Sequence, residues 1–326
     1  MTFFLRLTQS RLLLADNYNL EETDKMPDNA AIGFDLGGSH FAAGGVSDGT
    51  LKTKVIRVPI NNEWSQQMIL EAMAQVILEV KKQLIQQNYW VIGCGGGAPG
   101  PANFDTGVIG ETPNMPSMRG CHLSEELGDR TNLLCRINND ANLIVYGEAC
   151  AGAGKGHETV YGCTLGTGFG QGLVKDGKIH TGRNFKAMEV AKAPIGIDLV
   201  PDQTIEAMVS TGGIKNHFYN FTIGSGNPDP LQIEKMALDL KHSFHREAVE
   251  TYVTFGKWLG FTLSWVQALI APDIMLIGGN IAKAWPLFEP AMTEFFIKHS
   301  WENEPVIKPM ILGEEAGIIG GAYLHL

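Results

Sequence analysis

The sequence contains few cysteines and no pair of them with the spacing of a metal-binding or redox motif. No C-x-x-C pair occurs, and no cysteine follows Lys175. An odd number of widely spread cysteines is typical of reduced, buried side chains in a reducing compartment, which argues against a disulfide framework. Nothing beside any of them would obviously lower a thiol pKa, so we do not expect a catalytic thiol. The five residues are Cys94, Cys121, Cys135, Cys150 and Cys163.

Long apolar runs are absent as well, because no window approaches the length of a membrane span. Near the N-terminus, Arg6 and Arg11 interrupt an apolar stretch, and residues 12–15 are too few for the apolar core of a signal peptide. We therefore expect residues 1–30 to form an N-terminal extension, partly helical or disordered, on a cytoplasmic protein without a membrane partner.

Positive charge is in deficit. The chain has 25 Lys and Arg against 35 Asp and Glu, which gives a net charge of -10 and a pI near 5.4. This balance argues against a nucleic-acid partner and fits an enzyme that acts on small molecules. With 326 residues, of which 44% are hydrophobic, the chain is long enough for two domains with ample cores.

Two common nucleotide-binding patterns are missing. An expected strand over residues 31–36 runs directly into Gly37, Gly38 and Ser39, but no helix follows these glycines as a dinucleotide-binding fold would require. The P-loop pattern that ends in Gly-Lys-Ser/Thr does not occur. The chain instead predicts a tight turn, a second strand to Val46, an Asp-Gly turn and a third strand over residues 55–58.

Beyond this hairpin, apolar spacing and turn residues mark the remaining elements of the first half. Residues 95–116 are so rich in turn formers that they indicate either a long surface loop or a substrate-binding loop. We expect helices over residues 65–87 and 123–127, strands over residues 90–94 and 133–137, and a helical run to residue 151.

The second half of the chain repeats the pattern of the first. Residues 161–168 align with residues 32–39, and the Asp-Gly turns at Asp48 and Asp176 follow at nearly the same distance. An apolar strand that ends in paired glycines also comes late in each half. The sequence therefore predicts one α/β unit used twice. We expect helices starting near residue 205 and over residues 231–240, 243–269, 285–298 and 317–326.

The segment over residues 137–172 carries the candidate chemistry. Asn138, Asn139 and Asp140 follow an expected strand, and a carboxylate held between amides suits a base that accepts a proton from a hydroxyl. The glycine-rich stretch at residues 166–170 suits backbone N–H groups that approach phosphate oxygens. Together they indicate phosphoryl transfer to an alcohol. The alternative interpretations are a helix cap for the Asn-Asn-Asp run and an ordinary hairpin for the glycines.

Five short segments occur in a specific order from about residue 31 to the end of the chain. They are residues 35–39, Gly100 and Pro101 with Asn114, residues 139–142, residues 165–170, and residues 272–279. In this order they resemble the motifs of the sugar kinases of the ROK family, which have the actin-like, hexokinase-type ATPase fold.

The resemblance implies an α/β fold of two actin-like (ribonuclease H-like) domains with a central interdomain cleft. The first domain would comprise residues 31–145 with a C-terminal helix at about residues 313–326. The second domain would comprise residues 146–312 and hold the nucleotide.

The resemblance also implies a role for each motif. Asp140 would be the general base. Gly100, Asn114, Asn139, Glu189 and Glu206 would contact the sugar. Asp35 would lie near Mg²⁺, through water. The phosphates would be lined by Gly37, Gly38, Ser39, Gly166, Thr167 and Gly168, and the nucleoside by Gly278, Gly279 and Asn280.

One segment departs from the family pattern. Relatives commonly carry a Glu followed three residues later by His, and then a cysteine-rich zinc segment. Here Glu189 is followed by Lys192, and the cysteines are missing. We therefore expect no structural zinc, because thiolates are the ligands such a site needs. Lys192 can donate but not accept hydrogen bonds, so it would either change the sugar preference or be a plain surface lysine. The alignment of Glu206 is correspondingly open.

The resulting hypothesis is a kinase that uses ATP and Mg²⁺ to phosphorylate a hexose, with glucose and its 6-hydroxyl as the leading acceptor. An N-acylhexosamine or another hexose is the alternative substrate. A catalytically silent sugar-binding or regulatory protein is the alternative class. Family analogy further implies a homodimer, to which the helix over residues 243–269 would contribute.

Overall fold

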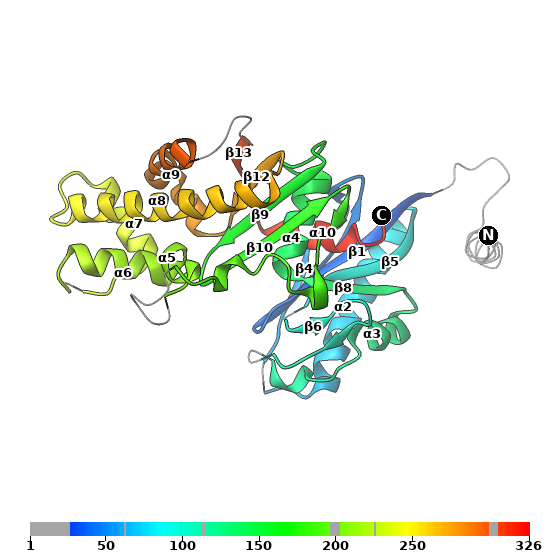
Figure 1. The fold of residues 1–326 in the computed structure, drawn as a ribbon. Helices are drawn as coiled ribbons and strands as arrows, with labels where there is room; N and C mark the ends of the chain where they lie inside the picture. The colour runs from blue at the N-terminus through cyan, green and yellow to red at the C-terminus, as the bar shows by residue number, and fades with distance from the viewer. Residues whose placement is uncertain are drawn as a thin grey trace.

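The computed structural model describes residues 27–61, 63–98, 100–112, 115–195, 203–224, 226–299 and 306–326. Two β-sheets and the helices around them form the molecule (Figure 1). Most of the expected N-terminal extension lies outside the described residues, and the first strand already begins at Asp28. No helix in the described part of the chain has the length and apolar character needed to cross a membrane.

The first sheet is built on an antiparallel hairpin followed by two parallel strands. Its strand order is β3-β2-β1-β5-β8, and β4 pairs with the same edge of β2 as β3 does. Strands β5 and β8 run parallel to β1. The strands are β1 (Asp28–Leu36), β2 (His40–Ser47), β3 (Thr50–Leu51), β4 (Ile56–Pro59), β5 (Tyr89–Ala98) and β8 (Cys135–Asn139).

The second sheet repeats this topology with the order β11-β10-β9-β12-β13. Its hairpin turns also correspond, because Asp48 and Asp176 both have positive φ angles, of 50° and 52°, before a glycine. The predicted internal repeat is therefore confirmed by the strand order. The strands are β9 (Thr159–Leu165), β10 (Phe169–Lys175), β11 (Lys178–Ile179), β12 (Ile274–Gly278) and β13 (Val306–Pro309).

Two helices lie between the sheets and join them. Helix α4 (Asp140–Ala151) packs on the second sheet, helix α10 (Ala316–Ala322) packs on the first, and the two helices pack on each other (Figure 1). Helices α2 (Gln66–Gln86) and α3 (Leu123–Thr131) cover the outer face of the first sheet. The outer face of the second sheet is covered by α5 (Ile205–Val209), α6 (Thr211–Phe221), α7 (Pro230–Leu238), α8 (His245–Ile270) and α9 (Trp285–His299).

Glycines allow α10 to approach the first sheet at backbone distance. A Cβ atom on Gly33 of β1 would overlap the carbonyl oxygen of Ile318, and one on Gly95 of β5 would overlap that of Gly321. Strand β5 continues through Gly95 to Ala98 and pairs there with β1 and β8, whereas the sequence predicted that it ends at residue 94. Glycine inside a strand marks such a close approach of another backbone.

The loop beyond β5 contains a small hairpin of β6 (Ala102–Asn103) and β7 (Val108–Ile109), which the sequence did not predict. Helix α6 was likewise not predicted as a separate helix. Because α10 packs on the first sheet, we propose that residues 31–145 with residues 313–326 form one domain and residues 146–312 the other.

Candidate active site

A cleft of about 770 Å³ opens between the two sheets. It is lined by the loop after β5, the first turn of α4, the start of β10 and the segment at residues 184–192. Its volume lies in the range of about 300–1,000 Å³ that is usual for small-molecule sites. Of the residues predicted to contact the sugar, the structure brings four together here: Gly100, Asn139, Asp140 and Glu189.

Asp140 is the first residue of α4 and is exposed in this cleft. The side chain of Asn139 caps the helix, because its Oδ1 accepts hydrogen bonds from the backbone N–H groups of Ala141 and Asn142 at 3.0 and 3.3 Å. The N–H of Ala141 also donates to Asp140 Oδ1 at 2.8 Å. The run is thus a helix cap, and the same cap fixes the direction of the Asp140 carboxylate.

Asp35 lies close to Asp140 across a glycine. In the register of the first sheet, Asp35 stands opposite Gly97, which stands opposite Asn138. A Cβ on Gly97 would lie 3.3 Å from Asp35 Oδ1 and 3.5 Å from the Cα of Asp140. Gly97 therefore leaves room for two carboxylates at the same edge of the sheet.

The surroundings of Asp35 disfavour its charge. Burial and the nearby Asp140 carboxylate raise its pKa, while His40 and Arg57 act in the opposite direction. His40 Nε2 lies 3.8 Å from Asp35 Oδ2. Repulsion between two neighbouring carboxylates is relieved when a cation binds between or beside them. Oxygen donors of this kind fit a hard cation such as Mg²⁺.

The two glycine turns occupy equivalent places in the two sheets. The first glycine turn (residues 37–39) connects β1 to β2, and the N–H of Gly37 donates to the carbonyl of His40 at 3.0 Å. The second glycine turn (residues 166–168) connects β9 to β10, and the N–H of Gly166 donates to the carbonyl of Gly168 at 3.0 Å. Gly38, Ser39 and Thr167 are exposed at the tips of these turns.

Glu206 does not line the cleft but holds the second glycine turn. Its Oε2 accepts a hydrogen bond from the N–H of Phe169 at 2.9 Å. A Cβ on Gly168 would lie 2.8 Å from the same oxygen, so the glycine leaves the space that the Glu206 carboxylate occupies. The sequence predicted a sugar contact for Glu206, whereas the structure pairs it with the backbone of the second glycine turn.

Glu189 and Lys192 face each other in the cleft. Lys192 Nζ lies 2.7 Å from Glu189 Oε2, and both residues line the cavity. Lys192 is therefore a residue of the cleft and not of the remote surface. It places a positive charge next to the carboxylate that was predicted to hold sugar hydroxyls.

Gly278, Gly279 and Asn280 lie elsewhere, at the carboxyl end of β12. They line a second hollow of about 380 Å³, together with Lys283, Glu314 and neighbouring apolar side chains. Gly279 has a φ of 87°, and a Cβ there would overlap the backbone of Leu165 just before the second glycine turn. This hollow is thus adjacent to that turn.

One predicted contact cannot be placed, and two aromatic residues were missed. Asn114 lies outside the described residues. Phe104 and Phe185 line the cleft and meet edge to face with ring centroids 5.3 Å apart. No sequence pattern marked this pair, because its members come from two different loops. Within the described ranges, no group of three or more His, Cys, Asp or Glu side chains could hold a metal ion.

The two sheets of equal topology, their paired glycine turns and the cleft between them define an α/β protein of the actin-like ATPase class. The chain belongs to the ROK family, whose family model matches residues 31–326.

Individual relatives match nearly the whole chain. A glucokinase of Thermotoga maritima is 30% identical over 319 residues, which cover 92% of this chain and 98% of the relative. An N-acetyl-D-glucosamine kinase of Escherichia coli is 27% identical over 312 residues, which cover 90% and 98%. The crystal structure of a ROK family glucokinase from Streptomyces griseus, in complex with glucose and AMPPNP, aligns with a TM-score of 0.70 at 22% identity. That match covers 91% of this chain and 99% of the other, and it confirms the predicted fold.

Proposed function

We propose that the protein is an ATP-dependent hexose kinase that transfers the γ-phosphoryl group to the 6-hydroxyl of glucose. The observation that carries the proposal is the position of Asp140, which is exposed in the cleft with Asn139 and Glu189 and lies beside Asp35. The glucokinase of Thermotoga maritima, which matches 92% of this chain, supports the choice of reaction and acceptor.

In this proposal Asp140 is the general base. Its Oδ1 is occupied by the N–H of Ala141, so the other oxygen takes the proton of the sugar hydroxyl. The hydroxyl oxygen then attacks the γ-phosphorus, and the bond from the γ-phosphorus to the oxygen it shares with the β-phosphate breaks, so that ADP leaves. Placing base, acceptor and phosphate in line is the main contribution of the protein.

The remaining predicted residues surround these reactants. Gly100, Asn114, Asn139 and Glu189 hold sugar hydroxyls, and Glu206 does so only if it leaves the N–H of Phe169. Backbone N–H groups of both glycine turns bind the phosphates: Gly37, Gly38, Ser39, Gly166, Thr167 and Gly168. The second hollow, with Gly278, Gly279 and Asn280, takes the nucleoside.

Asp35 is the residue that would hold Mg²⁺, through water. Its half-buried carboxyl has a raised pKa because of burial and Asp140, and a bound cation would favour its ionised form. When bound, Mg²⁺ neutralises charge on the phosphate oxygens. We expect no structural zinc, because the chain lacks cysteine after Lys175.

A second acceptor, N-acetyl-D-glucosamine, is favoured by one observation. The kinase of that name from Escherichia coli matches 90% of this chain at 27% identity. The Lys192–Glu189 ion pair also places a hydrogen-bond donor beside a carboxylate in the cleft. A panel of sugars therefore has to test which arrangement of acceptor hydroxyls the site binds. We further propose that the enzyme works as a cytoplasmic homodimer and supplies glycolysis.

The test is the release of ADP with Mg·ATP and a panel of hexoses and N-acylhexosamines, for the unsubstituted protein and for Asp140→Asn. General base catalysis contributes about 10²–10⁴-fold, and Asn139 keeps the helix cap, so kcat should fall by about that factor while the protein stays folded. Absence of turnover with every sugar, in a protein that still binds one, would instead establish a sugar-binding or regulatory protein.

A further inference from the structure

Arg57 lies in one row with Asp35 across three adjacent strands. In the register of the first sheet, Asp35 stands opposite Ala42, and Ala42 stands opposite Arg57. Residues in such a row face the same side of a sheet, and two strand spacings separate the outer members by about 10 Å. Only the small Ala42 lies between them. The side they share is the one that faces α10, because Ala42 and Ile318 belong to one buried cluster.

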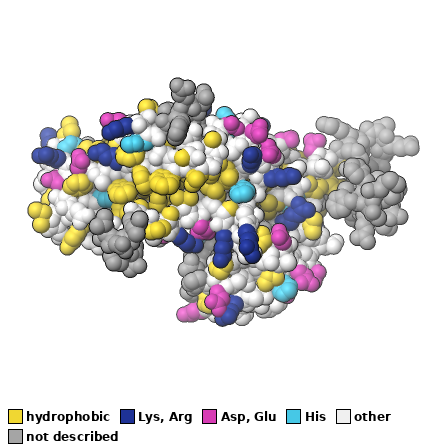
Figure 2. All heavy atoms as spheres, in the orientation of Figure 1, with side chains coloured by type: hydrophobic (Ala, Val, Ile, Leu, Met, Phe, Trp, Pro, Cys, Tyr) yellow, Lys and Arg dark blue, Asp and Glu magenta, His cyan; other side chains and the backbone are white. Residues whose placement is uncertain are grey.

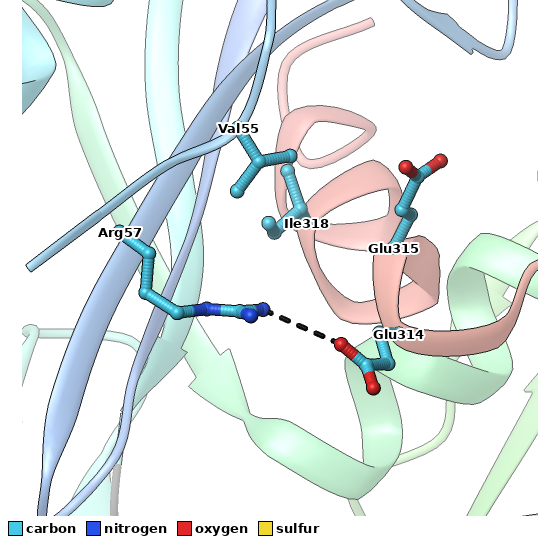
Figure 3. A pocket seen from close by; sticks show the side chains of 5 residues that line it. All are labelled: Val55, Arg57, Glu314, Glu315 and Ile318. Atoms are coloured by element: carbon cyan, nitrogen blue, oxygen red, sulfur yellow. Dashed lines mark ion pairs between the residues drawn. The ribbon is translucent and has the colours of Figure 1, made fainter.

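The present partner of Arg57 is Glu314, in the turn before α10. Arg57 Nη2 lies 3.6 Å from Glu314 Oε2, with side-chain exposures of 52% and 82%. Figure 3 shows the guanidinium reaching from its strand towards Glu314, while the carboxylate of Glu315 points away. A long, exposed pair of this kind contributes little stability, so Arg57 can exchange its partner at low cost.

Glu314 borders two hollows at once. With Arg57, Val55, Glu315 and Ile318 it lines a hollow of about 210 Å³ (Figure 3). It also lines the second hollow, where Gly278, Gly279 and Asn280 lie. The ion pair therefore connects the strand row that contains Asp35 and Arg57 with the hollow proposed to take the nucleoside.

We propose that Arg57 binds the phosphates of the nucleotide, and that Glu314 holds Arg57 only while the nucleotide is absent. This inference rests on the proposed kinase function. A guanidinium matches phosphate oxygens through paired hydrogen bonds, and it prefers a polyanion to a single exposed carboxylate. Arg57 also supplies positive charge to the side of the site that carries the carboxylates of Asp35, Asp140 and Glu314.

The experiment measures the affinity for Mg·ADP and Mg·AMPPNP by calorimetry without sugar, and the KM values for ATP and sugar. Arg57→Ala should weaken nucleotide binding about tenfold or more, with the sugar KM unchanged, because a charge-assisted contact to phosphate is lost. Glu314→Gln should strengthen nucleotide binding about two- to fivefold, because it removes the competitor of the phosphates. In the double variant the gain from Glu314→Gln should vanish.

The opposite signs, together with the loss of the Glu314→Gln gain in the double variant, separate the proposal from a purely structural ion pair and from a long-range charge effect, in which the two changes would add. If the pair only joins β4 to α10, both single variants should shift nucleotide affinity in the same direction or not at all, and the proposal is wrong. Arg130→Ala is the control, because Arg130 pairs with Glu126 on α3, across the sheet from this site, and nucleotide affinity should not change. An unsubstituted protein that binds no nucleotide would overturn the kinase function itself.

Discussion

Lys192 brings a positive charge into the cleft beside Glu189. Its ion pair with Glu189 is short, at 2.7 Å, but Lys192 is 79% exposed, so the pair is readily rearranged by a ligand. In a bound complex, Lys192 would donate to the sugar or orient Glu189 as an acceptor. Lys192→Ala should raise the sugar KM about tenfold and leave the KM for ATP unchanged, as steady-state kinetics with both substrates will show.

The exposed Lys241, which follows α7, offers a control for the loss of one positive charge. Lys241→Ala should leave both KM values unchanged. Equal changes in the KM values for sugar and ATP in Lys192→Ala would contradict a specific role in the sugar site. Partial recovery in Lys192→His would indicate that the donor, and not the charge, is what the sugar needs.

Asp35 illustrates a conflict between stability and function at a single residue. Its folded-state pKa is raised above the ordinary value of 3.8 by burial and by Asp140, so the unfolded state releases this proton more easily than the folded state. Ionised Asp35 therefore destabilises the ligand-free fold at pH values above its folded pKa. Asp35→Asn should raise the melting temperature at neutral pH, measured without Mg²⁺ or nucleotide.

The size of this gain should depend on pH in a defined direction. It should decrease as the pH falls through the raised pKa towards 3.8, because below that range the carboxyl is neutral in both states. A gain that persists unchanged at low pH would show that the asparagine acts through packing. The same substitution should abolish turnover if Asp35 holds Mg²⁺ as proposed.

At the scale of the elements, most of the fold could be predicted from the sequence, because turns and helices each leave a pattern in the local sequence. Hairpin turns marked by Asp-Gly pairs and long amphipathic helices, such as α2 and α8, depend on local pattern and were found close to their observed bounds. The end of β5 was missed because its glycines serve a contact with α10, which is more than 200 residues away in the chain. Local sequence contains no sign of such a contact.

In the candidate site, the sequence predicts the neighbours of residues that directly follow a strand. Asp140 and the two glycine turns follow strands directly, so their neighbourhood in space follows from the fold. The contact of Glu206 in α5 with the N–H of Phe169 in β10 and the pairing of Phe104 with Phe185 join segments that are distant in the sequence, and only coordinates reveal them. Both depend on tertiary packing that no spacing rule describes.

The packing of α10 against α4 makes a prediction about stability. A Cβ on Gly320 would overlap the carbonyl oxygen of Leu143, whereas the nearest atom to a Cβ on Gly317 of the same helix is 3.6 Å away. Gly320→Ala should therefore destabilise the protein by about 3 kcal/mol, because backbone must move apart. Gly317→Ala should be neutral or stabilise by up to about 1 kcal/mol through helix propensity.

Urea denaturation of both variants measures this difference. Similar free energies of unfolding for Gly320→Ala and Gly317→Ala would mean that the helices are not packed at backbone distance. A loss confined to Gly320→Ala would support the packing of α10 on α4 at backbone distance.

At the scale of the whole molecule, the outer surface of the second sheet's helices favours self-association. Hydrophobic side chains gather over α8 (Figure 2). Of the residues of α8, Trp265 and Leu269 are 53% and 75% exposed. Contiguous apolar surface of this kind marks an interface, and a two-fold dimer can bury the same patch on both copies.

Leu269→Lys should convert the proposed dimer to a monomer, measured by size-exclusion chromatography with light scattering, because two lysines would meet at the interface. Leu240→Lys, at a residue 83% exposed beyond α7, is the matched control and should remain dimeric. An unsubstituted protein that is monomeric at high concentration would refute the dimer, and a dimeric Leu269→Lys would move the interface away from this face.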